Sequence, residues 1–168
     1  NNNYSKINTN GSIYRYKHIL VICKNCNLVY SNPWLGHTNT NKLYSSSAIG
    51  SAFEQSEKEK KHFKCFKSFF PKKNCFKKNT NILEIGTATG SLLKNINIFY
   101  NLKKKNIDGI EPSTKLFEKL KNNNFFNIEN KFLNQIKTNK KYDLIIMDNV
   151  LEHIEEPKKS LKIVKSLM

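Results

Sequence analysis

The apolar residues in the first part of the chain fall into two short β-prone stretches. Residues 13–22 and 28–30 are rich in Ile, Val, Leu and Tyr, and the turn between them predicts a hairpin. Residues 1–11 are polar and Asn-rich, so we expect them to be disordered or the frayed edge of an element. The Gly-, Ser- and Asn-rich residues 35–52 predict a connection.

An amphipathic stretch follows the connection and predicts a helix over residues 53–70. Pro71 ends this pattern. Three phenylalanines recur among lysines at steps of three and four residues and form one apolar stripe: Phe63, Phe66 and Phe70. The sequence therefore predicts three parts: a hairpin segment at 12–36, a linker with one helix at 37–80, and a larger domain at 81–168.

From residue 81 onward, short apolar runs alternate with amphipathic stretches. The runs predict strands at 81–85, 107–110 and 142–147, with a weaker one at 126–128. The amphipathic stretches predict three helices, whose inward faces carry Leu92, Leu93, Ile96 and Phe99, then Leu116, Phe117 and Leu120, then Leu161, Val164 and Leu167. Ser113 is placed to cap the second helix, and Pro157 suits the first turn of the third. This alternation predicts an α/β fold with a doubly wound parallel sheet.

Glycines and acidic residues stand at the carboxyl ends of these predicted strands. The first strand runs into Gly86-Thr-Ala-Thr-Gly90, the second ends at Glu111, and the 142–147 strand ends at Asp148-Asn149. Taken alone, a glycine-rich turn or a carboxylate at a strand end is more often a structural feature than a ligand site. In doubly wound sheets, however, ligands bind beyond the carboxyl ends of the strands. The joint occurrence of these residues therefore predicts a cofactor site there.

Residues 81–168 resemble the class I S-adenosylmethionine-dependent methyltransferases. Three segments carry the resemblance: Asn81-Ile-Leu-Glu-Ile-Gly-Thr-Ala-Thr-Gly90, Ile107-Asp-Gly-Ile-Glu-Pro-Ser113, and Tyr142-Asp-Leu-Ile-Ile-Met-Asp-Asn-Val-Leu-Glu-His-Ile-Glu-Glu-Pro157. They look like the family's glycine loop, its acidic ribose-binding segment and its fourth-strand motif with Leu-Glu-His. The resemblance implies a Rossmann-like sheet, truncated at the C-terminus because the later strands are not in this chain.

The resemblance also implies a role for each matching residue. Those that would bind S-adenosylmethionine are Glu84, Gly86, Ala88, Gly90, Glu111, Asp148 and Asn149. In the family pattern Glu111 binds the ribose, and the glycine loop passes beneath the methionine moiety. Ala88 stands where glycine is common, and we expect its methyl group to be tolerated in a turn that needs no positive φ. A dinucleotide-binding fingerprint fits poorly, because it needs glycine at the positions of Ala88 and Ser91.

Cys23 and Cys26 lie at the turn of the predicted hairpin, where both thiolates could reach one zinc ion. Four ligands are required, and no other residue has convincing spacing; those considered are His18, His37, Cys65 and Cys75. The segment from Cys23 to Pro33 resembles the second half of a zinc-binding module that precedes some methyltransferase domains, including sugar C-methyltransferase relatives. This implies zinc in the full-length protein; the alternative is two free thiols on a loop.

The net charge of +16 raises the possibility of a nucleic-acid partner. The charge is nearly all scattered lysine, and Arg15 is the single arginine. Lysine and asparagine are over-produced by AT-rich coding sequences, so a nucleic-acid partner is disfavoured without being excluded. No apolar run is long enough to span a bilayer, and the four cysteines fit no disulfide framework. We therefore expect a cytoplasmic protein, and the sequence does not indicate its oligomeric state.

His153 is the candidate catalytic base, because imidazole can accept a proton near neutral pH. Glu152 and Asp148 are alternatives, and His153 could instead cap or pack against the following helix. The predicted function is methyl transfer to a small-molecule acceptor, such as a sugar nucleotide or another biosynthetic intermediate. Two alternatives stay open: an RNA methyltransferase with a zinc module, and a non-catalytic fragment, since the chain does not begin with Met and stops within a helical pattern.

Overall fold

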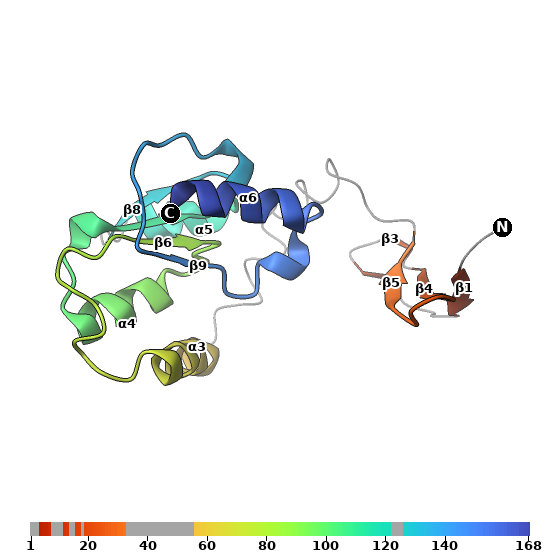
Figure 1. Ribbon diagram of the computed structural model, residues 1–168, viewed down its shortest axis with the longest axis horizontal. Helices are drawn as coiled ribbons and strands as arrows, with labels where there is room; N and C mark the ends of the chain where they lie inside the picture. Colours follow the sequence, from red (N-terminus) through yellow and green to blue (C-terminus); the bar gives the residue numbers. More distant parts are fainter. Residues whose placement is uncertain (1–3, 8–11, 14–15, 18, 33–55, 122–125) are drawn as a thin grey trace. The chain divides into compact units, whose positions relative to one another are not determined.

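The computed structural model describes residues 4–7, 12–13, 16–17, 19–32, 56–121 and 126–168 (Figure 1). The chain divides into two compact units, Asn1–Asn39 and Thr40–Met168. Each unit is considered separately below. Among the described residues, no helix has the length and apolar character needed to cross a membrane.

The first unit holds small antiparallel sheets. Strands β1 (Tyr4–Ile7), β4 (Leu20–Cys23) and β5 (Val29–Ser31) form one sheet in the order β1-β4-β5. Strands β2 (Ser12–Ile13) and β3 (Tyr16–Lys17) form a separate pair. The β4–β5 hairpin agrees with the prediction from the sequence.

Two details of this unit differ from expectation. The polar residues 1–11 are expected to be disordered or the frayed edge of an element, yet β1 pairs antiparallel with β4, with Tyr4 opposite Cys23 and Ile7 opposite Leu20. A strand ladder is made by backbone groups, which every residue type supplies, and composition therefore did not reveal it. The β-prone stretch at 13–22 is also not one strand, because it contributes to β2, β3 and β4.

The second unit is built on a four-stranded parallel sheet. Its strands are β6 (Ile82–Ile85), β7 (Ile107–Ile110), β8 (Asn127–Glu129) and β9 (Leu144–Ile146). The order is β8-β7-β6-β9, so the first strand of the alternating region lies between the second and the fourth. This confirms the predicted α/β fold.

In the part of this unit that the structure describes, four helices and three short 3₁₀ turns accompany the sheet. The helices are α3 (Ser56–Phe69), α4 (Ser91–Tyr100), α5 (Thr114–Lys121) and α6 (Pro157–Leu167). The 3₁₀ turns are η2 (Lys104–Asn106), η3 (Leu133–Gln135) and η4 (Leu151–His153). The Ser113 hydroxyl lies 3.5 Å from the backbone N–H of Leu116, which is the N-cap position predicted for α5. The predicted helix start at residue 53 lies outside the described residues.

The core of this unit lies on both faces of the sheet, because successive strand residues point to opposite sides. Figure 1 shows α3 and α4 on one side and α6 on the other. One apolar cluster contains Ile82, Leu92, Leu93, Ile96, Tyr100, Leu102 and Ile107, and the other contains Leu83, Ile85, Ile110, Leu133, Tyr142 and Leu167. This two-sided burial is the doubly wound arrangement that the sequence predicted.

Candidate functional site

The loop after β6 passes through left-handed backbone conformations. Gly86 has φ 75° and Gly90 has φ 71°, a region that residues with a side chain rarely adopt. A Cβ atom at Gly86 would lie 2.7 Å from Cγ2 of Val150, and one at Gly90 would lie 2.7 Å from Cδ2 of Leu120. Both glycines are therefore required by conformation and by space. The loop turns tightly from the end of β6 into the start of α4.

Ala88, in the same loop, also has a positive φ, of 46°. The expectation that this position needs no positive φ is therefore wrong. The cause is tertiary: the backbone N–H of Ala88 donates a 2.8 Å hydrogen bond to Oε2 of Glu111 on the neighbouring strand. The backbone forms that bond with Ala88 in the left-handed conformation, which a glycine would adopt without strain.

Replacing Ala88 by glycine is expected to stabilise the folded chain by about 0.5–1 kcal/mol. The left-handed conformation costs alanine about 1–2 kcal/mol, and the greater freedom of glycine in the unfolded chain removes part of the gain. Urea denaturation of both proteins measures the difference. Lys115→Gly, at an exposed position within α5, is the control, and it should destabilise the folded chain by about 0.5–1 kcal/mol. A less stable Ala88→Gly protein would contradict the strain argument.

Glu111, directly after β7, ties two turns together through its carboxylate. Oε2 accepts the N–H of Ala88, and Oε1 accepts the N–H of Ser113, both at 2.8 Å. The side chain is buried, and burial raises the pKa of Glu111 while the two backbone N–H groups oppose that rise. A carboxylate offers about four lone-pair positions, so about two remain for a ligand's hydroxyl groups.

Glu84, within β6, is buried without a hydrogen-bond partner for its Oε2 among the described residues. Burial raises the pKa of Glu84 well above its usual range, and the negative charges of Asp148 and Glu111 raise it further. Three carboxyl groups from three neighbouring strands therefore share one electrostatic environment. A buried carboxyl group with no partner is costly, and a cationic or hydrogen-bond-donating ligand would offset that cost.

Replacing Glu84 by glutamine is expected to stabilise the ligand-free chain near neutral pH. A folded-state pKa above the unfolded value means that the folded chain binds the proton more tightly. The contribution of Glu84 to the free energy of unfolding is therefore fully present below the ordinary glutamate pKa. It is lost as the pH rises from that value toward the raised pKa of the folded state. Each unit of the rise costs about 1.4 kcal/mol, and glutamine removes that loss.

Denaturation of both proteins across this pH range measures the effect. The difference in stability should grow with pH, while Glu118→Gln on the exposed face of α5 should leave the pH profile of the wild type unchanged. Parallel pH profiles for wild type and Glu84→Gln would count against a raised pKa.

Asp148 and Asn149 follow β9 at the same edge of the sheet as the ends of β6 and β7. Nδ2 of Asn149 donates to Oδ1 of Asp148 at 3.3 Å, and Asn149 has φ 53°. Oδ2 of Asp148 contacts Nδ1 of His62, which comes from α3. Sequence reasoning missed His62, because 86 positions separate it from Asp148 and only the packing of α3 brings them together.

His153, the histidine nominated from the sequence, lies in η4, where its side chain is exposed. Its role as a base stays a prediction. The structure thus brings the residues of the predicted cofactor set to one edge of the sheet and adds His62 there through its contact with Asp148.

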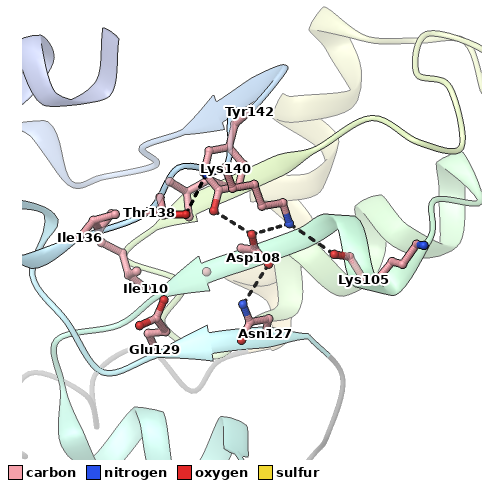
Figure 2. A pocket seen from close by; sticks show the side chains of 11 residues that line it. Lys105, Asp108, Ile110, Asn127, Glu129, Ile136, Thr138, Lys140 and Tyr142 are labelled. Atoms are coloured by element: carbon pink, nitrogen blue, oxygen red, sulfur yellow. Dashed lines mark hydrogen bonds and ion pairs between the residues drawn. The ribbon is translucent and has the colours of Figure 1, made fainter. Parts of the chain in front are cut away.

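A cavity of about 340 Å³ lies along β7 and β8 (Figure 2). At its centre, Asp108 accepts hydrogen bonds from Lys140 and Tyr142 at 2.7 Å and from Asn127 at 3.2 Å. Burial, followed by the hydrogen bond to Asp108, raises the pKa of Tyr142. These groups satisfy one another, so we interpret the network as part of the protein's own packing.

Cys23 and Cys26 lie at the β4–β5 turn, as predicted. The N–H of Cys23 donates to the carbonyl of Leu28 at 2.8 Å, and the N–H of Asn27 donates to the carbonyl of Cys23 at 2.9 Å. The backbone N–H groups of Cys26 and Asn25 point at the Cys23 thiol and lower its pKa. This favours the thiolate, the form that binds metals.

The donor set for zinc is nevertheless incomplete in the part of the chain that the structure describes. No group of three or more His, Cys, Asp or Glu residues there could hold a metal ion. His18 and His37 lie outside the described residues, while Cys65 and Cys75 are free and exposed in the second unit. Two thiolates do not fit a four-ligand site by themselves.

A family model described as "Methyltransferase domain" matches residues 41–168. The chain therefore belongs to this methyltransferase domain family. No curated protein matches the sequence.

Several solved methyltransferases share the fold. The plantazolicin methyltransferase BpumL in complex with SAH is 19% identical with a TM-score of 0.59, over 76% of this chain and 52% of that one. N-methyltransferase NodS from Bradyrhizobium japonicum, also in complex with SAH, is 14% identical with a TM-score of 0.56, over 78% and 66%. Coclaurine N-methyltransferase, bound to N-methylheliamine and SAH, is 12% identical with a TM-score of 0.54, over 65% and 32%. The chain spans about half the length of the BpumL structures that it matches.

Proposed function

We propose that this chain binds S-adenosylmethionine and contributes to methyl transfer to a small-molecule acceptor. The observation that carries the proposal is the convergence at one sheet edge of a left-handed glycine loop, the anchored carboxylate of Glu111 and the buried Glu84, whose Oε2 has no hydrogen-bond partner among the described residues. Membership of the methyltransferase domain family supports it, and so do the SAH-bound structures that share the fold.

Each part of the site has a distinct task in this proposal. The free lone pairs of Glu111 accept the ribose hydroxyl groups, and Gly86 and Gly90 let the backbone approach the methionine moiety closely. Asp148 supplies negative potential that favours the cofactor's ammonium and sulfonium groups, and a cationic ligand would in turn favour the ionised form of Glu84. The bound cofactor supplies an electrophilic methyl group. The protein contributes by holding the acceptor in line with that group.

A small-molecule acceptor is supported by relatives of the same fold that bind compounds of this kind. One is bound to N-methylheliamine, and BpumL is also known in complex with desmethylPZN analogs. Zinc stays a proposal for the full-length protein, because the described residues offer Cys23 and Cys26 but no group of three or more possible ligands. The four free cysteines are consistent with a reducing, cytoplasmic setting.

Calorimetric titration of S-adenosylhomocysteine into the purified chain tests the proposal. We expect saturable binding with one site per chain, and no competition by a short RNA oligonucleotide at physiological salt. Cooperative unfolding in urea would show that the chain is folded. Absence of binding heat from such a chain would overturn the proposed function. Binding of RNA but not of the cofactor product would favour the nucleic-acid alternative.

A further inference from the structure

A histidine–aspartate pair lies at the edge of the candidate cofactor site and joins two distant parts of the second unit. Nδ1 of His62 in α3 contacts Oδ2 of Asp148 after β9. The side chains are 33% and 35% exposed, so a solute can reach the pair. Asp148 also lies close enough to Glu84 to raise the pKa of its buried carboxyl group. The pair therefore borders the carboxyl cluster described above.

Aromatic packing fixes the helix that carries His62. The ring of Phe63 meets that of Phe99 edge-on with 5.8 Å between centroids, and Phe66 meets Tyr100 in the same way at 6.1 Å. The Tyr100 hydroxyl also donates to the backbone carbonyl of Phe70. Because α4 starts at the glycine loop and ends at Tyr100, the later part of α3 lies against the end of α4 that is far from the site.

The first part of α3 consequently points toward the carboxyl ends of the strands. His62 precedes Phe63 and reaches Asp148 there, with Phe63, Phe66 and Phe70 holding the helix in place. His62 is therefore held by a packed helix rather than by a loop, and its ring nitrogen has a defined partner.

The contact determines which nitrogen of a neutral His62 carries the proton. A carboxylate accepts hydrogen bonds, so Nδ1 must be the protonated nitrogen. Nε2 then carries a free lone pair and can accept a proton, while Asp148 stabilises the imidazolium that forms. Among the described residues, no hydrogen bond or ion pair engages Nε2 of His62.

We infer that His62, oriented by Asp148, is the base that accepts the proton lost by the methyl acceptor. This inference rests on the proposed function. In the step, a lone pair on the acceptor's oxygen or nitrogen forms a bond to the methyl carbon. The carbon–sulfur bond breaks, and its electron pair returns to sulfur. The acceptor's proton passes to Nε2 of His62, and water removes it later. Asp148 is the positioning residue.

Nitrogen NMR of the imidazole rings tests the assignment. In ¹⁵N-labelled chain, long-range ¹H–¹⁵N spectra at a pH where His62 is neutral distinguish a protonated Nδ1 from a protonated Nε2. The His62→Gln variant assigns the signals of His62. We expect the Nδ1–H form in the wild type. In Asp148→Asn, the amide can donate to Nδ1, so the Nε2–H form should replace it.

A matched control and a chemical readout complete the test. Lys64→Gln, at an exposed position of the same helix, should leave the His62 tautomer unchanged. Diethyl pyrocarbonate labelling read by mass spectrometry should modify His62 several-fold more slowly in Asp148→Asn than in the wild type. A wild-type Nε2–H form, or a tautomer and labelling rate insensitive to Asp148→Asn, would overturn the inference.

Titration of S-adenosylhomocysteine into the same labelled sample separates this inference from the function on which it rests. Saturable binding together with the Nε2–H form would reject His62 as the base and leave the cofactor site standing. Absence of binding by the folded chain would reject the proposed function, and the catalytic inference with it.

Discussion

Replacing Glu111 by alanine is expected to weaken the binding of S-adenosylhomocysteine by at least about 100-fold. The carboxylate is the acceptor proposed for the ribose hydroxyl groups, and each hydrogen bond to a charged group is worth about 1.5–3 kcal/mol. Two such bonds exceed the 2.8 kcal/mol that corresponds to about 100-fold in affinity. Glu111 also anchors the N–H groups of Ala88 and Ser113, so its loss releases the loop that should contact the methionine moiety.

The comparison needs variants that separate lost contacts from lost folding. Glu111→Ala leaves two backbone N–H groups without their acceptor and should destabilise the chain by about 1–3 kcal/mol, which urea denaturation measures. Glu111→Gln keeps the shape and one carbonyl acceptor, so we expect intermediate affinity. Glu118→Ala, at an exposed position of α5, is the matched control and should bind like the wild type. Undiminished affinity in folded Glu111→Ala protein would remove Glu111 from the site.

Replacing Gly109 by alanine is expected to destabilise the chain by about 1–3 kcal/mol and to weaken cofactor binding. Gly109 lies in the middle of β7, between β6 and β8, with ordinary strand backbone. A Cβ atom there would lie 2.3 Å from Cγ2 of Thr87 and 2.7 Å from Cδ1 of Ile128. Overpacking of this kind typically costs about 1–3 kcal/mol. Thr87 belongs to the glycine loop, so we expect relief of the clash to turn the Thr87 side chain or shift that loop.

A second substitution tests whether Thr87 is the obstacle. Thr87→Ser removes the methyl group that the new Cβ would strike and keeps the hydroxyl. The double variant should recover part of the stability and the affinity lost by Gly109→Ala, as a favourable coupling in a double-mutant cycle. If the effects of the two substitutions on stability and affinity simply add, the Thr87 methyl group is not the obstacle to a side chain at position 109.

Local pattern alone was enough to predict the framework of the second unit. The buried run at 82–85, the amphipathic spacing of Leu92, Leu93 and Ile96, and Pro157 at the start of α6 each reflect a preference that operates over a few residues. Strand–helix alternation then leaves few possible topologies. The position of Glu111 at a strand end followed from the same pattern, because parallel strands present their carboxyl ends at one edge.

Three features were decided by the tertiary structure. Ala88 has a positive φ because its N–H is bonded to Glu111 on another strand. The pKa of Glu84 is raised because the completed sheet buries it beside other carboxyl groups. His62 meets Asp148 because phenylalanines hold α3 against α4. Each depends on contacts between residues far apart in the chain, and local periodicity carries no information about such contacts. The sequence by itself therefore determined the main strands and helices of the second unit and the sheet edge at which the candidate site lies, while packing decided which side chains meet there and the raised pKa of Glu84.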